Sequence, residues 1–141
     1  MTTRPLPKIP RPTVLIVDDD EEMREYEAPR ILRGLIPGVA VIGVANVAAA
    51  LVMMTEHRPD WILTDVYLSS SFGSGLDVAT LAHSKNIPVV AMSMHCVTAP
   101  PGVPLASKEH LKDDLAAIIA GRSPSKHDLT ATGRFVAGAK A

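Results

Sequence analysis

Five apolar runs of strand length occur along the chain, and the first shows their character most clearly. Residues Thr13 to Val17 form an uninterrupted β-rich run that ends abruptly in Asp18, Asp19 and Asp20. An apolar run bounded by charge is typical of a strand that is buried on both faces, at the centre of a parallel sheet. Comparable runs occur at residues 39–45, 60–65, 87–92 and 103–107. The pattern therefore predicts a sheet of five strands.

The segment that follows the first run, residues 20–34, has the charge pattern of a helix. Its acids come first and its arginines last, as the helix dipole favours. Met23, Tyr26 and Leu32 are its apolar positions, and we expect them to face the core. Pro29 has no amide proton, and its ring clashes with the carbonyl of Glu25 in an α-helix. We therefore expect a kink or break between Glu25 and Pro29.

Three further segments are predicted to be helical, at residues 47–57, 76–85 and 109–121. Asn46 is suited to cap the first of these. The last is amphipathic, because Leu111, Leu115 and Ile118 recur at helical spacing. Strands that alternate with helices in this way specify a three-layer α/β fold with a parallel sheet.

The composition divides the chain into a domain and two ends. We assign residues 13–121 to a single α/β domain, residues 1–12 to a flexible Pro-rich leader and residues 122–141 to a flexible tail. The net charge is −1, but the leader and the tail carry +3 each, which leaves −7 for the domain. An acidic domain argues against direct binding of nucleic acid. The single Cys96 and the absence of any membrane-length apolar run predict a cytoplasmic protein with no membrane contact.

Chemically reactive side chains follow four of the five predicted strands. They are Asp18 and Asp19 after the first, Asp65 at the end of the third, Ser93 after the fourth and Lys108 after the fifth. Because parallel strands end at one edge of the sheet, where open α/β sheets bind their ligands, we expect these side chains to meet. Carboxylates, Mg²⁺ and a lysine are the components of phosphoryl transfer, in which an aspartate can form an acyl phosphate.

The cluster of acids after the first strand has two interpretations. Crowded carboxylates repel one another unless a cation or protons intervene, and hard oxygen ligands suit Mg²⁺. This predicts a Mg²⁺ site at the end of the first strand. The alternative is that Asp20, Glu21 and Glu22 only cap a helix and favour its positive end. Asp18 and Asp19 are the preferred acid pair, because they directly follow the strand, and Asp19 with Asp20 is the alternative pair.

Several sequence blocks carry a resemblance to a known family. They are VLIVDDDEEMRE, RPDWILTDVYL, GLDVATLA, IPVVAMS and the region of Lys108, and together they cover roughly residues 13–121. The first two blocks are specific and the others are supportive. With these blocks the chain resembles a receiver domain of the two-component response regulator family. The resemblance implies a doubly wound, flavodoxin-like sheet.

The resemblance also implies a role for each residue at the strand ends. Asp65 would accept a phosphoryl group from a histidine kinase or a histidine phosphotransfer protein, Ser93 would contact that group, and Lys108 would be its cationic partner. Mg²⁺ would be bound by Asp18 (through water), Asp19, Asp65 and the backbone carbonyl of Tyr67. The chain would then be a stand-alone signalling protein rather than an enzyme, and it would act on a downstream protein. A homodimer is a further expected form of association.

Three features depart from the family pattern. Glu109 follows Lys108 where the family usually has proline, often after a cis bond, so we expect a trans bond and a repositioned Lys108 loop. Leu105 stands where the family has its aromatic switch residue. The segment between Ser93 and Lys108 is short, and Pro100 and Pro101 in it disfavour helix, which predicts a loop or a single turn at residues 94–102 in place of the fourth helix. A subfamily with a reduced fourth helix shares this last feature.

Two other functions fit parts of the sequence. A pseudo-receiver that binds its partner without phosphorylation is favoured by Glu109 and Leu105, and disfavoured by the intact acids. A haloacid dehalogenase-like phosphatase would use Asp18 and Asp20, with Asp113 and Asp114 in its later motifs. That assignment leaves Asp65 without a role, and Asp113 and Asp114 fall inside a predicted helix.

Overall fold

The parallel sheet is the central layer of the molecule. The computed structural model describes residues 6, 9–68, 74–94 and 101–124. The strands are β1 (Thr13–Val17), β2 (Ala40–Val44), β3 (Trp61–Asp65), β4 (Val89–Ser93) and β5 (Leu105–Ser107). Their order in the sheet is β2-β1-β3-β4-β5, and every pairing is parallel. This confirms the predicted five-stranded doubly wound sheet of flavodoxin-like order.

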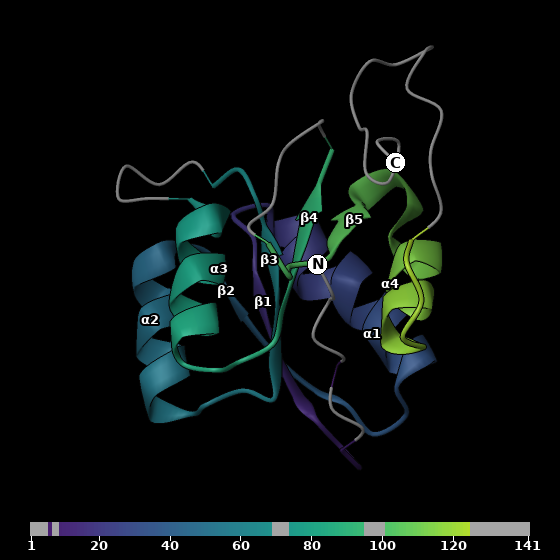
Figure 1. Ribbon diagram of the computed structural model, residues 1–141, viewed down its shortest axis with the longest axis horizontal. Coiled ribbons are helices and arrows are strands. Elements are labelled where there is room, and N and C mark those ends of the chain that lie inside the picture. The colour runs from purple at the N-terminus through teal and green to yellow at the C-terminus, as the bar shows by residue number, and fades with distance from the viewer. Residues whose placement is uncertain (1–5, 7–8, 69–73, 95–100, 125–141) are drawn as a thin grey trace.

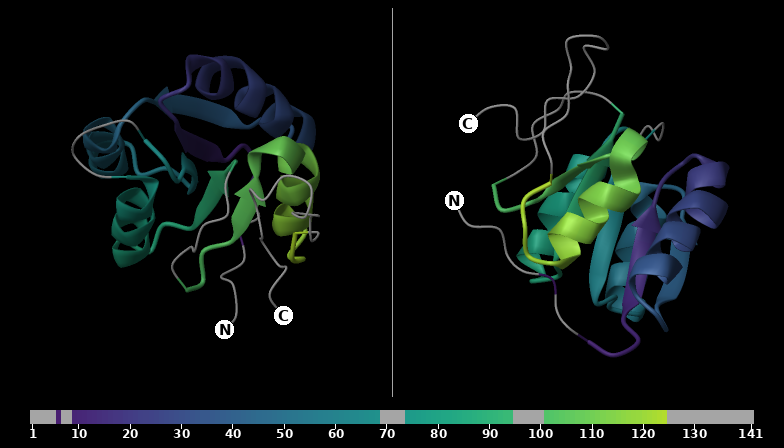
Figure 2. Two further views of the ribbon diagram at one scale, coloured as in Figure 1. Left: turned by 90° about the horizontal axis from the view of Figure 1, so that it is seen from above. Right: turned by 90° about the vertical axis from the view of Figure 1, so that its right-hand side faces the viewer.

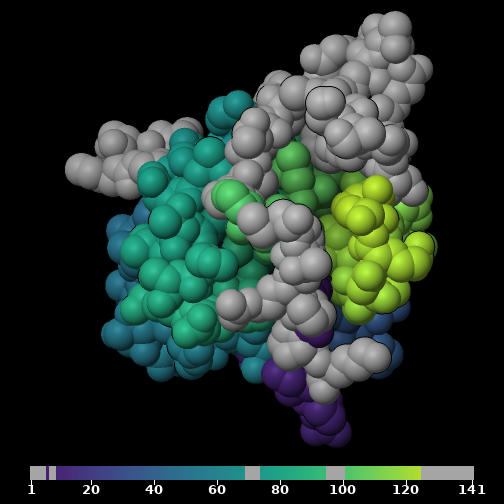
Figure 3. Space-filling view, viewed as in Figure 1, coloured from purple at the N-terminus to yellow at the C-terminus, as the bar shows by residue number. Residues whose placement is uncertain are grey.

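Helices cover both faces of this sheet, which completes the predicted three layers. They are α1 (Ala28–Leu35), α2 (Val47–Glu56), α3 (Gly75–Ser84) and α4 (Leu111–Ile119), with a π-helical turn η1 (Glu22–Glu27) and a 3₁₀ turn η2 (Lys108–His110). α2 and α3 lie on one face, and α1 and α4 lie on the other (Figures 1 and 2). In the space-filling view, α3 and α4 form opposite flanks of the molecule (Figure 3).

Each face of the sheet has its own apolar core. β3 and β4 are buried at every position, as the continuous apolar runs predict for central strands. Leu15 and Ile62 pack with α2 and α3, whereas Ile16 and Leu63 pack with α1 and α4. Alternate residues of one strand therefore serve opposite cores, which is the period of two expected of a strand.

The first helical segment changes its hydrogen-bond pattern just before the proline. The Ala28 N–H donates to the carbonyl of Met23, five residues back, and the regular α-helix begins at Ala28. The expected irregularity between residues 25 and 29 is thus present as a π-helical turn. Tyr26, however, is 61% exposed, so the expectation that it faces the core is wrong. A π-helix has more residues per turn than an α-helix, so the buried positions are five apart, at Met23 and Ala28.

The other helices begin and end close to the predicted residues. Asn46 caps α2, because its Oδ1 accepts a hydrogen bond of 2.8 Å from the Ala49 N–H. Gly121 follows α4 with a φ of 79°, the left-handed conformation expected after a helix. The segment predicted at 109–121 is divided into η2 and α4. None of the described residues between Ser93 and Leu105 is helical, and most of the predicted loop at 94–102 lies outside the described residues.

The described part of the leader contacts the domain. Leu6 is partly buried against the core beneath α1 and α4. With Ile9, Pro12 and Trp61 it lines part of a groove of about 320 Å³ at the amino-terminal edge of the sheet. Flexibility of residues 1–12 and 122–141 stays a prediction, because most of these residues lie outside the described part. No helix in the described ranges is long and apolar enough to cross a membrane.

Gly75 allows α3 to begin directly against the end of β3. Its N–H donates to the carbonyl of Val66 at 2.9 Å, and a Cβ at this position would lie 1.6 Å from the Asp65 carbonyl oxygen. Any residue with a Cβ would require the backbone to move, so only glycine fits at this position. The close approach therefore ties α3 to the strand end that carries Asp65.

We predict that Gly75→Ala lowers the free energy of unfolding by about 1–3 kcal/mol, because the added methyl meets backbone rather than a side chain that can move. Gly34→Ala is the matched control. No atom lies within 4 Å of its added Cβ in α1, so the gain in helix propensity should stabilise the protein by about 0.5–1 kcal/mol. Urea unfolding of both variants measures the difference. Equal stabilities for the two variants would contradict the close approach at Gly75.

Candidate functional site

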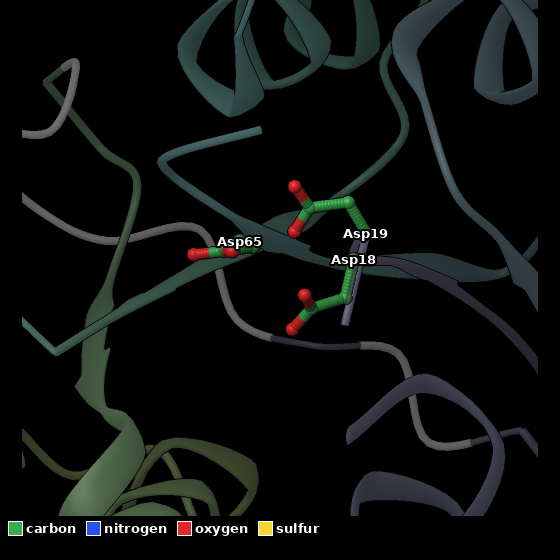
Figure 4. A group of neighbouring side chains, drawn as sticks. All are labelled: Asp18, Asp19 and Asp65. Carbon is green, nitrogen blue, oxygen red and sulfur yellow. The ribbon is translucent and has the colours of Figure 1, made fainter. Parts of the chain in front are cut away.

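Three carboxylates meet at the carboxyl edge of the sheet. β1 and β3 are neighbours, and their register pairs Val17 with Thr64, so the residues that follow are level with each other. Asp18 follows β1 and Asp65 ends β3. One oxygen of each of Asp18, Asp19 and Asp65 lies within 4.8 Å of the other two. Figure 4 shows the three side chains turned toward a common space.

The acids differ in their exposure to solvent. Asp18 is fully buried and Asp65 is 6% exposed, whereas Asp19 is exposed. The Asp18 backbone is held on both sides, because its N–H donates to the Val44 carbonyl at 3.1 Å and its carbonyl accepts from Arg24 Nη1 at 3.1 Å. Its Oδ1 accepts a hydrogen bond of 2.9 Å from the Asp20 N–H. The turn after β1 is therefore built around the Asp18 side chain.

Lys108, which directly follows β5, extends its side chain to the acids. Its Nζ lies 2.8 Å from Asp18 Oδ2 and 3.1 Å from Asp65 Oδ2. The peptide bond to Glu109 is trans, as expected, since the described residues contain no cis bond. The glutamate at this position thus leaves the ammonium in contact with both buried carboxylates. One ammonium compensates part of the charge that three clustered acids would otherwise hold unbalanced.

The pKa of Asp65 and the pKa of Lys108 are both raised, although burial and charge act with opposite signs on the two groups. Burial raises the pKa of Asp65, the Lys108 charge lowers it, and the nearby Asp18 raises it again, so that the net pKa is about 6. Burial alone would lower the pKa of Lys108. The hydrogen bond to Asp18 and the charges of Asp65 and Asp18 outweigh burial, and the pKa of Lys108 is raised. Lys108 is therefore a permanent cation at neutral pH.

The remaining predicted site residues lie around this cluster. Ser93 ends β4, is buried, and pairs with Ser107 in the register of β4 and β5, one residue before Lys108. The Tyr67 N–H donates to Asp65 Oδ1 at 3.4 Å, and the role of its carbonyl as a metal ligand stays a prediction. Asp20 lies outside the cluster of three carboxylates. Its Oδ1 accepts from the Glu22 N–H at 3.2 Å, which is the helix-capping geometry of the alternative interpretation.

The donor set fits a hard divalent cation. Three carboxylates offer oxygen atoms within 4.8 Å of one another, and Mg²⁺ prefers such ligands together with water. Asp18 Oδ2 is buried, and the Lys108 ammonium contacts it at 2.8 Å. An oxygen in that state can accept a further cationic partner. Asp18, Asp19 and Asp65 are thus the residues that would hold Mg²⁺.

Asp114 also supports this edge of the sheet, although the sequence suggested it only as part of a phosphatase motif. It is fully buried on α4, and its Oδ2 accepts a hydrogen bond of 2.8 Å from the Ser107 N–H. Asp113, by contrast, is exposed. Neither belongs to the acid cluster found among the described residues. The signal in the sequence was an acid three residues after Leu111, on the face that the buried leucines define.

The comparisons with known proteins agree with the fold. The family model described as the response regulator receiver domain matches residues 14–99. The comparison with curated proteins found no match.

Several solved structures are similar to the chain. A response regulator receiver protein from Sinorhizobium medicae is 22% identical, with a TM-score of 0.64 over 77% of this chain and 90% of that one. The response regulator PhyR from Brucella abortus is 22% identical, with a TM-score of 0.63 over 78% of this chain and 46% of that one. The anti-anti-sigma factor PhyR from Bartonella quintana is 23% identical, with a TM-score of 0.63 over 81% and 48%.

We predict that Asp65→Asn stabilises the metal-free protein at about pH 8 and has little effect near pH 4. The pKa of Asp65 is about 6 in the folded protein and about 3.9 in an unfolded chain. Between these values the folded state keeps a proton that the unfolded state has lost, so stability falls as pH rises. Above pH 7 the buried charge should cost about 1–2 kcal/mol after allowance for solvent screening, and asparagine removes that cost.

Urea unfolding in EDTA at the two pH values measures this difference. Asp60→Asn is a control for the loss of an acid elsewhere, because the Asp60 carboxylate lies at the opposite edge of the sheet, where it accepts from the Thr13 amide at 2.7 Å. A gain at Asp65→Asn that is as large near pH 4 as near pH 8 would show that the buried charge is not its source.

Proposed function

The chain belongs to the response regulator receiver family, and from that premise we propose that it is a phosphoacceptor in a two-component phosphorelay. Asp65 accepts a phosphoryl group from the phosphohistidine of a histidine kinase or a histidine phosphotransfer protein. The observation that supports this most is the position of Asp65, a nearly buried carboxylate that lies beside the acids that follow β1 and 3.1 Å from the Lys108 ammonium. The phosphorylated form then acts on a downstream protein.

In the proposed transfer, a carboxylate oxygen of Asp65 attacks the phosphorus atom as the bond to the histidine nitrogen breaks. The electron pair of that bond returns to the imidazole, and Asp65 becomes an acyl phosphate. The carboxylate must be ionised to attack, which its pKa of about 6 allows at neutral pH. Mg²⁺, when bound, would neutralise charge on the phosphoryl oxygens.

Two of the chain's own residues assist the acceptor in this proposal. The Lys108 ammonium, 3.1 Å from Asp65 Oδ2, shifts to an oxygen of the incoming phosphoryl group and offsets its charge. Ser93, at the end of the neighbouring strand β4, donates its hydroxyl to another of these oxygens. Ser93 ends β4 and Lys108 directly follows β5, so the backbone of both residues is in place before the phosphoryl group arrives and only their side chains need to move.

The surface beside Asp65 suits a protein partner. Tyr67 follows β3 and is 55% exposed, and Met94 follows β4 and is 36% exposed. Aromatic and methionine side chains are enriched at protein interfaces. A partner that carries the phosphohistidine must approach this edge of the sheet, so these two side chains are the proposed contacts of that partner. The acidic domain supports a protein rather than a nucleic acid as the direct partner.

A phosphorylation-independent pseudo-receiver is the second candidate. The Lys108 ammonium already balances Asp18 and Asp65 in the unmodified protein, and Leu105 begins β5 where the resemblance calls for an aromatic residue. In that case partner binding would need no acyl phosphate. The same labelling experiment separates the two candidates.

We predict that the protein gains one phosphoryl group when it is incubated with acetyl phosphate and Mg²⁺, and that Asp65→Asn abolishes the gain. Without Mg²⁺ the phosphoryl oxygens would meet uncompensated carboxylates, so labelling should fall at least about tenfold. Intact-mass spectrometry measures both effects. Asp20→Asn is the matched control, because Asp20 is outside the group of three carboxylates and its Oδ1 accepts from the Glu22 N–H, so this variant should label at the wild-type rate.

Phosphotransfer from candidate histidine kinases under the same conditions identifies the physiological donor. If the Asp65→Asn variant is still labelled, another residue is the acceptor. A protein that is not labelled by acetyl phosphate or by any kinase, yet binds a partner, would favour the pseudo-receiver.

A further inference from the structure

Two hydrogen bonds hold the turn that carries Lys108, and one of them joins the turn to α4. The Ser107 N–H donates to Asp114 Oδ2 at 2.8 Å, and Ser107 Oγ accepts from the Glu109 N–H at 3.2 Å. Ser107 is therefore fixed through its backbone on one side and through its side chain on the other. Lys108 stands between these two contacts, at the start of η2.

Asp114 is an unusual residue for its position. It is fully buried on the face of α4 that also buries Leu111 and Leu115. A buried carboxylate is costly unless it is hydrogen-bonded or compensated by charge. Here it lies in the first turn of α4, where the helix dipole favours an anion, and it accepts the Ser107 amide. An apolar side chain would pack equally well but would leave that buried amide without an acceptor.

The contact links α4 to the acid cluster through a short chain of neighbours. Ser107 pairs with Ser93 at the ends of β5 and β4. The next residue, Lys108, reaches Asp18 at 2.8 Å and Asp65 at 3.1 Å. A shift of the Ser107 backbone would therefore move the ammonium and the end of β5 together. Where other receivers are expected to shape this turn with a proline after the lysine, this chain has Glu109, whose amide makes one of the two bonds.

We propose that Asp114 is a positioning residue, which holds the Ser107 backbone so that the Lys108 ammonium stays on Asp18 and Asp65. It touches neither the phosphoryl group nor the metal and acts only through Lys108. Its effect on phosphoryl transfer rests on the proposed function. Its effect on the place of the ammonium does not, and this allows the two to be tested apart.

The first test is labelling by acetyl phosphate with Mg²⁺ at several donor concentrations. We expect Asp114→Ala to lower the maximal labelling rate about tenfold without a matching change in the concentration of half-saturation, because a misplaced ammonium weakens the transition state most. Asp114→Asn keeps an oxygen acceptor for the Ser107 amide and should stay within about threefold of wild type. Asp113→Asn, an exposed acid on the same turn, should be unchanged.

A double-mutant cycle shows whether the effect passes through Lys108. In a Lys108→Ala background, Asp114→Ala should have no further effect on the labelling rate, because the group that it positions is absent. A deficit that persists undiminished in this background would overturn the proposal, since it would reflect general loss of structure. If Asp114→Ala does not fold, Asp114→Glu serves instead, because it keeps the charge but moves the carboxylate away from the Ser107 amide.

The second test needs no phosphorylation. The Lys108 ammonium repels Mg²⁺ from the acids, so Lys108→Ala should raise the affinity for Mg²⁺ severalfold, and Asp114→Ala should raise it in the same direction. NMR titration measures these affinities and also the Ser107 amide shift, which should move upfield when the carboxylate acceptor is lost. A wild-type Mg²⁺ affinity in Asp114→Ala would overturn the proposal. An affinity change without any labelling of the wild-type protein would refute the phosphorelay function but leave the role of Asp114 intact.

Discussion

The charge balance between one ammonium and a cluster of carboxylates governs the edge of the sheet where the strands end. Asp18 is fully buried and Asp65 nearly so, and each lies within about 3 Å of Lys108 Nζ. Burial of uncompensated carboxylates would be strongly unfavourable, and the ammonium offsets part of that cost. It also leaves negative charge in excess, since three acids face one cation. The excess of negative charge makes the site attractive to a further cation.

The fold places these groups by register rather than by long loops. β1 and β3 are adjacent and level at their ends, and β4 and β5 bring Ser93 and Ser107 into line on the other side. β1, β3, β4 and β5 each have a polar residue at or directly after the strand end, and the apolar residues before it pack into the two cores. Gly75 allows α3 to press against the end of β3, and Asp114 of α4 holds the end of β5. Both helices therefore contribute to the site without supplying a reactive group.

The π-helical turn after β1 serves the same edge. It precedes Pro29, where an α-helical hydrogen bond could not form, and it carries Arg24 back to the carbonyl of Asp18. The long stem of Arg24 passes over Gly43 of β2, where a Cβ would lie only 2.8 Å from Arg24 Cγ. Irregular helical geometry at this point thus supports the backbone of the buried acid.

The sequence by itself determined the architecture and which polar side chains gather at the carboxyl edge of the sheet. Continuous β-rich apolar runs of strand length, bounded by charged or turn residues, favour strands buried on both faces, and their alternation with helices favours a parallel sheet. Once the strands are parallel, Asp18, Asp65, Ser93 and Lys108 must share one edge. Local signals were sufficient for the Asn46 cap and for the Gly121 stop, because both depend on a few neighbouring residues.

Only the tertiary structure decided the features that depend on contacts between distant elements. Tyr26 faces solvent, because the π-helical turn changes the helical phase, and an α-helical period could not reveal this. In the sequence, Asp114 is one more acid in an amphipathic helix. Its role becomes visible only in the fold, where it accepts a hydrogen bond from the Ser107 N–H at the end of β5. The position of the Lys108 side chain was also open, because Glu109 stands where the family usually has proline, and this suggested a different path for the loop. The distances to Asp18 and Asp65 show where the ammonium lies, since electrostatic attraction and the hold on Ser107 act across the fold rather than along the chain.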